Sequence, residues 1–367
     1  MKKLFYFAAA AVALAACAKN EVIPVNSGEN QEITFNVAPK TKADPEPKKD
    51  AFSTDKVFAS WAYYLPKGTE ANPNNWADDW AVRKDAKEYI SGSTIKCISG
   101  VWKNESTSYY WPKDGKLTFF AYSLNRGNLD LNHSEGHSYP ILCHNSEKAY
   151  GINAIIDLSE NPNLDLLVAE IAADKTHNED FHNLNGVPTL FKHKFSRVQF
   201  AVKKKENYNG VSIKLNSITF NKVVSVGTYC QYNREDGKKT FTKDYYKEGD
   251  VRSSAVYTTS VFEVDSKDAF KLVPETNEIK YIYMPQNFSG VEEADKIATI
   301  AVTYTVTYKD GISETYTRTI NVKEIFGSWE MGKKYTFNLI FSLNEITWAP
   351  VVEDWESVTP ATDRIVE

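Results

Sequence analysis

The sequence predicts an all-β fold with two β-sandwich domains in series. Residues that favour strands are abundant, since the 367 residues include 21 Tyr, 19 Phe and 8 Trp. Short apolar runs alternate with turn residues along most of the chain, which is the pattern of sandwich proteins. No segment keeps the apolar spacing of an amphipathic helix over three turns.

Residues 1–17 are predicted to be a lipoprotein signal peptide. Lys2 and Lys3 precede an apolar run over residues 4–16, and a basic start, a short apolar core and small residues at its end define a secretory signal. The run is shorter than the roughly 20 apolar residues of a membrane-spanning helix. Its end, Leu-Ala-Ala-Cys17, resembles the lipobox of bacterial lipoproteins, in which the cysteine receives the lipid. The alternative is an ordinary cleaved signal with a chance cysteine.

Residues 18–50 are predicted to hold a polar tether, a first strand and a cleavable linker. Ile33, Phe35 and Val37 alternate with polar residues, so we expect them on one face of a strand at a sheet edge. The following segment, 38–50, carries three prolines and four lysines. Such a segment cannot form a core, and we expect it to be exposed and open to proteases.

The rest of the chain is predicted to form an N-terminal sandwich, residues 51–186, and a C-terminal sandwich, residues 187–367. The polar stretch Asp174–Gly186 marks the boundary. A change of parity in the apolar positions predicts a β-bulge at Ser196-Arg197. Strands are predicted over residues 58–64, 117–122, 191–202, 299–308 and 335–343.

Charge and cysteine content limit the possible functions. A formal net charge of -5 leaves no basic face for nucleic acid. Beyond Cys17 the cysteines are Cys97, Cys143 and Cys230, an odd number at wide spacing. We therefore expect structural thiols with at most one disulfide, and neither a metal site nor a redox pair.

No catalytic motif stands out. The nucleophile elbow, the phosphate loop and the HExxH zinc motif are missing from the sequence. Carboxylates are numerous, but nothing selects a pair that could flank a glycosidic bond. His133 and His137 lie in a turn-rich region, whereas His193 lies among strand residues and indicates a core histidine with satisfied hydrogen bonds. We expect no catalytic residue, no metal and no cofactor.

Several segments together resemble the fimbrillins, the type V pilins of Bacteroidetes. They begin with the lipobox and with a first strand followed by Thr41-Lys42-Ala43. Each segment alone is weak evidence for the resemblance, but together they follow one another in order over nearly the whole chain. The later ones are Tyr110-Trp111-Pro112 with residues 117–122, Asp165 to Ala169, Phe191 to Val198, and Gly332 through Trp355.

The resemblance implies two transthyretin-like sandwiches and a lipid-anchored protein of the outer membrane that belongs to a surface fimbria and mediates adhesion. It implies other fimbrial subunits as partners. A protease would cut after the first strand, near Lys40 or Lys42, and a strand of another subunit would replace the strand of Ile33, Phe35 and Val37. The family commonly carries an arginine where Lys42 stands, so an arginine-specific protease would not cut there.

Two features leave the exact role open. The residues after Trp355 alternate little and make a poor donor strand, which favours a tip, anchor or accessory subunit. Trp76 and Trp80 lie on a polar loop, where flat aromatic rings could stack on a sugar. A glycan-binding outer-membrane lipoprotein is therefore the alternative, with a host or bacterial surface glycan or protein as its partner. A secreted hydrolase comes third.

Overall fold

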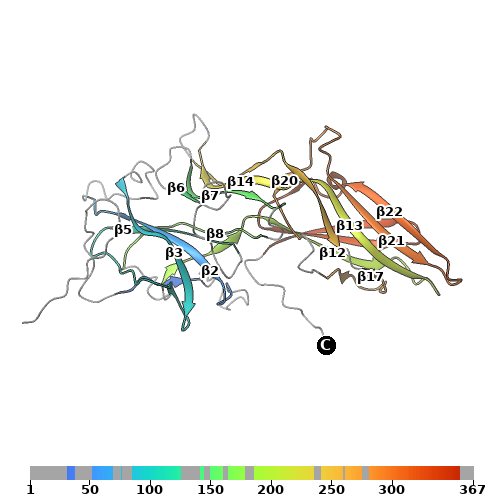
Figure 1. The fold of residues 1–367 in the computed structure, drawn as a ribbon, viewed down its shortest axis with the longest axis horizontal. Coiled ribbons are helices and arrows are strands. Elements are labelled where there is room, and N and C mark those ends of the chain that lie inside the picture. Colours follow the sequence, from blue (N-terminus) through green and yellow to red (C-terminus); the bar gives the residue numbers. More distant parts are fainter. Residues whose placement is uncertain are drawn as a thin grey trace, which may run out of the picture.

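The computed structural model describes residues 31–37, 52–68, 76, 85–124, 141–143, 149–159, 164–177, 186–234, 241–258, 261–274 and 281–355. These residues form strands joined by turns, and the 3-10 helix η3 (Val322–Glu324) follows β22 (Ser313–Asn321) directly. The strands build two sandwiches that follow one another along the long axis of the molecule (Figure 1). The predicted all-β fold with β-sandwich domains is confirmed.

The N-terminal sandwich is built around a nine-stranded sheet. Its strands are β1 (Phe35–Asn36), β2 (Val57–Leu65), β3 (Lys87–Ile98), β4 (Val101–Asn104), β5 (Lys116–Ser123), β8 (Leu167–Ala169), β9 (Ala172–Lys175), β10 (Val187–Pro188) and β11 (Phe191–His193). They lie in the order β10-β1-β4-β3-β2-β5-β8-β11, and β9 also pairs with β5. All nine residues of β2 are buried, because separate apolar clusters cover the two faces of this strand.

A four-stranded sheet completes this sandwich. Its strands are β6 (Ile141–Cys143), β7 (Ala149–Asp157), β14 (Val226–Asn233) and β15 (Thr242–Glu248), in the order β15-β14-β7-β6. Side chains of both sheets share one core cluster. Its members include Phe120, Tyr122, Ile152, Ile156 and Tyr229.

The predicted boundary after residue 186 does not coincide with a change of sheet. β10 and β11 lie beyond this point, yet they pair with β1 and β8 of the nine-stranded sheet. β14 lies farther along still and pairs with β7. The second half of the chain thus returns to complete the first sandwich.

The C-terminal sandwich consists of two five-stranded sheets and a two-stranded ribbon. One sheet contains β12 (Ser196–Lys204), β18 (Lys271–Leu272), β19 (Ile282–Tyr283), β24 (Lys333–Phe341) and β25 (Ile346–Asp354). The other contains β13 (Ser212–Val224), β16 (Arg252–Thr258), β17 (Phe262–Glu263), β21 (Thr299–Thr307) and β22 (Ser313–Asn321). The ribbon pairs β20 (Gln286–Asn287) with β23 (Ser328–Trp329).

The alternation predicted for the C-terminal sandwich is confirmed on β21. Ile300, Val302, Tyr304 and Val306 are each 0% exposed and lie in one apolar cluster between the two sheets. The intervening threonines face outward and bond to hydroxyls of β22, as period-two strands require. Gly311 adopts a φ of +85° in the turn between the two strands, as its position after Asp310 predicts.

The predicted bulge at Ser196-Arg197 is wrong. β11 ends at His193 and pairs with β8 in the N-terminal sandwich, whereas β12 starts at Ser196 and pairs with β24 in the C-terminal sandwich. The change of parity marks the passage of the chain from one sandwich to the other. Within the described ranges, no helix has the length and apolar character needed to cross a membrane.

Candidate functional site

The first strand, β1, lies inside the nine-stranded sheet. Phe35 pairs with Val187 of β10 in parallel and with Trp102 of β4 in antiparallel orientation. The predicted edge position is therefore wrong, because β10 returns from far along the chain to cover the outer side of β1. The strand is second from the edge of the sheet, with a paired strand on each side, although it comes first in the sequence.

Backbone hydrogen bonds hold the strand from both sides. Odd-numbered residues bond toward β4 and the segment that follows it, and even-numbered residues bond toward β10, as in a regular sheet. The bonds, donor first, are Ile33 N to Tyr109 O (2.7 Å), Trp111 N to Gln31 O (3.1 Å), Val187 N to Thr34 O (2.8 Å) and Thr189 N to Asn36 O (2.8 Å). These contacts depend on the backbone and are indifferent to the side chains of the strand.

The inward face of β1 is fully buried, as its alternation predicts. Ile33, Phe35 and Val37 are 2%, 3% and 5% exposed and belong to one apolar cluster. The ring of Phe35 meets Phe58 of β2 edge to face, with centroids 5.5 Å apart, and meets Phe119 of β5 in the same way at 5.9 Å. Phe35 thus fills a pocket with aromatic walls.

The outward face of the strand carries a charged contact. The carboxylate of Glu32 lies 3.3 Å from Nζ of Lys103 on β4, and it accepts a hydrogen bond of 2.7 Å from the hydroxyl of Ser108. Gly186 approaches the strand closely, because a Cβ atom there would lie 2.7 Å from the carbonyl of Thr34. A side chain at position 186 would therefore displace the strand.

The other residues predicted for anchoring and processing lie outside the described ranges. Cys17, Lys40 and Lys42 are among them, so lipid attachment and proteolytic cleavage stay predictions. Cys97 lies on β3 and Cys230 on β14, in different sheets, and the two sulfurs are not bonded to each other.

The glycan-stacking hypothesis is wrong for Trp76. Its side chain is 1% exposed and packs against Tyr63 and Phe120, with ring centroids 6.0 and 5.7 Å away. Its backbone N–H donates to the carboxylate of Asp174, at 2.7 Å. The indole faces are taken by the core and offer no platform for a sugar. Trp80 lies outside the described ranges.

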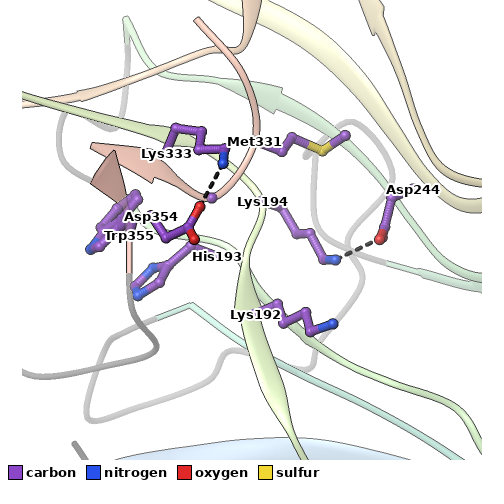
Figure 2. Close-up of a pocket in the computed structure, with 9 residues that line it drawn as sticks. Lys192, His193, Lys194, Asp244, Met331, Lys333, Asp354 and Trp355 are labelled. Carbon is purple, nitrogen blue, oxygen red and sulfur yellow. Dashed lines mark hydrogen bonds and ion pairs between the residues drawn. The ribbon is translucent and has the colours of Figure 1, made fainter. Parts of the chain in front are cut away.

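A pocket of about 420 Å³ lies where the two sandwiches meet (Figure 2). The imidazole of His193 stacks on the indole of Trp355 with centroids 3.7 Å apart, and its Nδ1 lies 2.6 Å from a carboxylate oxygen of Asp165. His193 is therefore a buried, hydrogen-bonded histidine, as predicted. The stack connects the end of β25 to the end of β11, that is, one sandwich to the other.

The three lysines of this pocket all have acidic partners. Nζ of Lys192 lies 2.6 Å from Glu170, and Nζ of Lys333 lies 2.5 Å from Asp354. Lys194 points to Asp244 at 2.6 Å (Figure 2). Carboxylates thus neutralise the three lysine charges of this pocket between the sandwiches.

Lys194 is the most buried of these cations. Its side chain is only 6% exposed. Burial lowers the pKa of Lys194, while the carboxylate of Asp244 opposes this shift. Asp244 also accepts the hydroxyl of Tyr229 at 2.7 Å, and burial raises the pKa of that tyrosine. Among the residues that the structure describes, no group of three or more His, Cys, Asp or Glu side chains is placed to hold a metal ion.

Sequence reasoning missed the contacts that surround the first strand. Lys103 and Ser108 are ordinary polar residues of a hairpin and of the segment after it, and nothing local connects them to Glu32. Asp165 and His193 are likewise far apart in the sequence. The only signal that could have indicated their proximity is paired variation between relatives, which a single sequence does not contain.

Comparison with known proteins identifies the family. A family model described as fimbrillin-like matches residues 41–355, which is most of the chain. A search of the curated proteins finds no match to the sequence.

A solved structure shares the fold, with a TM-score above 0.5. A fimbrial protein from Bacteroides vulgatus is 16% identical with a TM-score of 0.54, and the match covers 89% of this chain and 100% of that one. A candidate cell adhesion protein from Bacteroides uniformis is 14% identical with a TM-score of 0.47, over 90% of this chain and 99% of that one. At 16% identity, the likeness to the fimbrial protein is one of fold. The extent of the family match, in contrast, shows that the chain belongs to the fimbrillin-like family.

Proposed function

We propose that the chain is a subunit of a cell-surface fimbria. Its precursor is anchored in the outer membrane through a lipid on Cys17, and the subunit is assembled by exchange of its first strand once the chain is cut after Lys40 or Lys42. Its family supports a fimbrial and adhesive role. The observation that carries strand exchange is the place of β1, which pairs with a strand on each side and is buried on its inner face. The proline- and lysine-rich segment 38–50 is its covalent connection to the rest of the fold.

The energetics favour replacement of the strand over an empty groove. Burying an Ile, Phe or Val side chain contributes about 1.5–3 kcal/mol, so the three inward side chains of β1 contribute roughly 5–9 kcal/mol as an upper estimate. A whole domain is stable by about 5–15 kcal/mol. A subunit that lost β1 would therefore need a strand from a partner, which is recognition by β-strand addition.

The position in the fimbria is a tip, an anchor or an accessory place. Residues 356–367 show little alternation of apolar and polar residues, so they make a poor donor strand. A subunit that accepts a strand and donates none ends a chain of exchanges. The partners are accordingly other fimbrial subunits.

Expression of a tagged chain in a fimbriated Bacteroides host tests the assembly. We expect unheated SDS gels to show oligomers that collapse on heating, and N-terminal sequencing to find a new start after Lys40 or Lys42. The double variant Lys40→Ala/Lys42→Ala should abolish both results. The matched variant Lys48→Ala/Lys49→Ala changes two lysines of the same linker and should leave them intact. A surface protein that retains residues before Lys40 and stays monomeric would refute the assembly by cleavage and exchange.

Feeding the same cells an alkyne-tagged fatty acid tests the anchor. The uncut precursor should carry the label, because a cut after Lys40 or Lys42 removes Cys17 from the chain, and the uncut Cys17→Ala precursor should lack the label. Cys97→Ala is the matched control, because it removes a cysteine of the folded domain and should keep the label. Equal labelling of wild type and Cys17→Ala would show that Cys17 is not the attachment site.

A further inference from the structure

We infer that the groove around β1 selects its strand at two positions, requiring an aromatic ring where Phe35 lies and a carboxylate where Glu32 lies. The inference rests on the proposed strand exchange and specifies its partner. The partner strand then has a carboxylate at its first position, apolar side chains at its second and sixth positions, and an aromatic ring at its fourth. We call this order the acidic–aromatic pattern.

The walls of the pocket for the aromatic ring belong to strands other than β1. Phe58 and Phe119, which form these walls, are 0% and 3% exposed and lie on β2 and β5. Phe58 is also held by Phe52 and Phe191, with ring centroids 6.1 and 5.3 Å away. The walls meet the ring of Phe35 at 85° and 88°, the edge-to-face arrangement that aromatic pairs prefer. An aliphatic side chain would leave part of this space empty.

The contacts of the Glu32 carboxylate favour an acidic residue at this position of the strand. Lys103 and Ser108 belong to β4 and to the segment after it, so both remain in the fold when β1 leaves. The side chains of Glu32 and Lys103 are 26% and 32% exposed, so the pair is partly shielded from solvent. Loss of the strand removes this acidic partner from Lys103, and a basic residue in its place would be repelled.

The remaining contacts of the strand discriminate less. The backbone bonds to Tyr109, Trp111, Val187 and Thr189 form with any sequence other than proline at a donor position. The apolar positions of Ile33 and Val37 accept many aliphatic side chains. Specificity therefore depends on the ring of Phe35 and on the charge of Glu32.

The pattern begins a second time in this chain, at Glu345-Ile346-Thr347-Trp348. That segment leads into β25, which pairs with β24 along nine residues from Ile346 to Asp354. A copy of this chain could offer the segment only by giving up this pairing. The groove is therefore better matched to the first strand or to a strand of another subunit.

Peptide exchange into the cut chain tests the inference. The protein used is residues 18–367 with a specific protease site placed between residues 43 and 50. It is cut at this site and unfolded, and the first segment is removed. The remaining chain is then refolded with a fluorescent peptide of residues 30–38. The Phe35→Ala peptide should bind at least about a hundredfold more weakly than the parent peptide. The Thr34→Val peptide is the matched control and should bind within about threefold of it, because Thr34 points away from the aromatic pocket.

A charge exchange tests the second position. The Glu32→Lys peptide should bind about fivefold more weakly to the unchanged chain. The Lys103→Glu chain should restore its binding. Lys96→Glu, which reverses a neighbouring charge on β3, is the matched control and should not restore it.

The outcomes separate the two proposals. If the parent peptide binds but Phe35→Ala binds equally well, or if Lys103→Glu fails to restore the Glu32→Lys peptide, the selection is refuted while strand exchange stands. If the parent peptide itself does not bind to a chain whose C-terminal sandwich has refolded, strand exchange is refuted and the selection falls with it.

Discussion

Both sandwiches have cores of buried apolar side chains, but they differ in how the chain closes them. In the C-terminal sandwich, β21 and β22 pair along nine residues and are joined by a short turn. In the N-terminal sandwich, Phe35 reaches the core on a two-residue strand whose neighbours β4 and β10 come from distant parts of the chain. The contrast shows that burial and covalent continuity are separate properties. A strand can be essential to a core and still be joined to its neighbours only by hydrogen bonds and packing, which is the condition that the proposed exchange requires.

Deleting residues 1–37 should have the largest effect and should separate the two sandwiches. The N-terminal sandwich would lose roughly 5–9 kcal/mol, which is close to the stability of a whole domain. The C-terminal sandwich should keep its own unfolding transition, because none of its strands pairs with β1. Differential scanning calorimetry and limited proteolysis would measure this. Loss of both transitions together would mean that the sandwiches unfold as one unit.

A pair of equivalent truncations sharpens the comparison. Phe35→Ala and Phe220→Ala should each cost about 3–5 kcal/mol, since both rings are buried among other aromatic rings. Urea unfolding followed by tryptophan fluorescence would measure the loss.

The stabilities of the two variants should respond differently to an added peptide of the first strand. Excess peptide of residues 30–38 should stabilise Phe35→Ala once the linker is cut, because a ligand that binds only the folded state raises its stability. It should do nothing for Phe220→Ala, whose ring belongs to the continuous strand β13. Rescue of neither variant, or of both, would contradict the distinction drawn between the two cores.

The smallest effect concerns the junction between the sandwiches. Burial holds the pKa of Lys194 below its ordinary value of 10.5. Between the lowered value and 10.5 the unfolded chain binds more protons than the folded chain, so the free energy of unfolding rises with pH through this window. Lys194→Met should remove this rise, measured as urea midpoints between about pH 8 and 10.5. Lys214→Met, at an exposed lysine, should leave it; equal slopes in all three proteins would contradict the assignment.

Local patterns in the sequence predict the strands that pair with near neighbours. The alternation of Val302, Tyr304 and Val306 reports a buried face directly, and it holds wherever one face of a strand is covered. The same reasoning places Ile33, Phe35 and Val37 on the buried face of β1. These predictions need only the period of the side chains.

What the sequence does not predict depends on partners far along the chain. The parity change before Val198 is equally compatible with a bulge and with a passage between two sheets, and only the pairing of β11 and β12 decides between them. Trp76 stands among turn residues, but burying its large indole against Tyr63 and Phe120 outweighs the polarity of its neighbours. The partners of Glu32 depend in the same way on where β4 lies.

The mixed orientation of the neighbours of β1 would fix the polarity of assembly by the proposed strand exchange. Any guest that keeps the bonds of β1 must run parallel to β10 and antiparallel to β4, so it can enter in one direction only. An interface of this kind joins unlike surfaces and has no twofold symmetry. Repeated by subunits that both accept and donate a strand, it gives an open filament instead of a closed dimer. A fimbria built on such joints has two chemically different ends, one that presents an unfilled groove and one that presents an uncommitted strand.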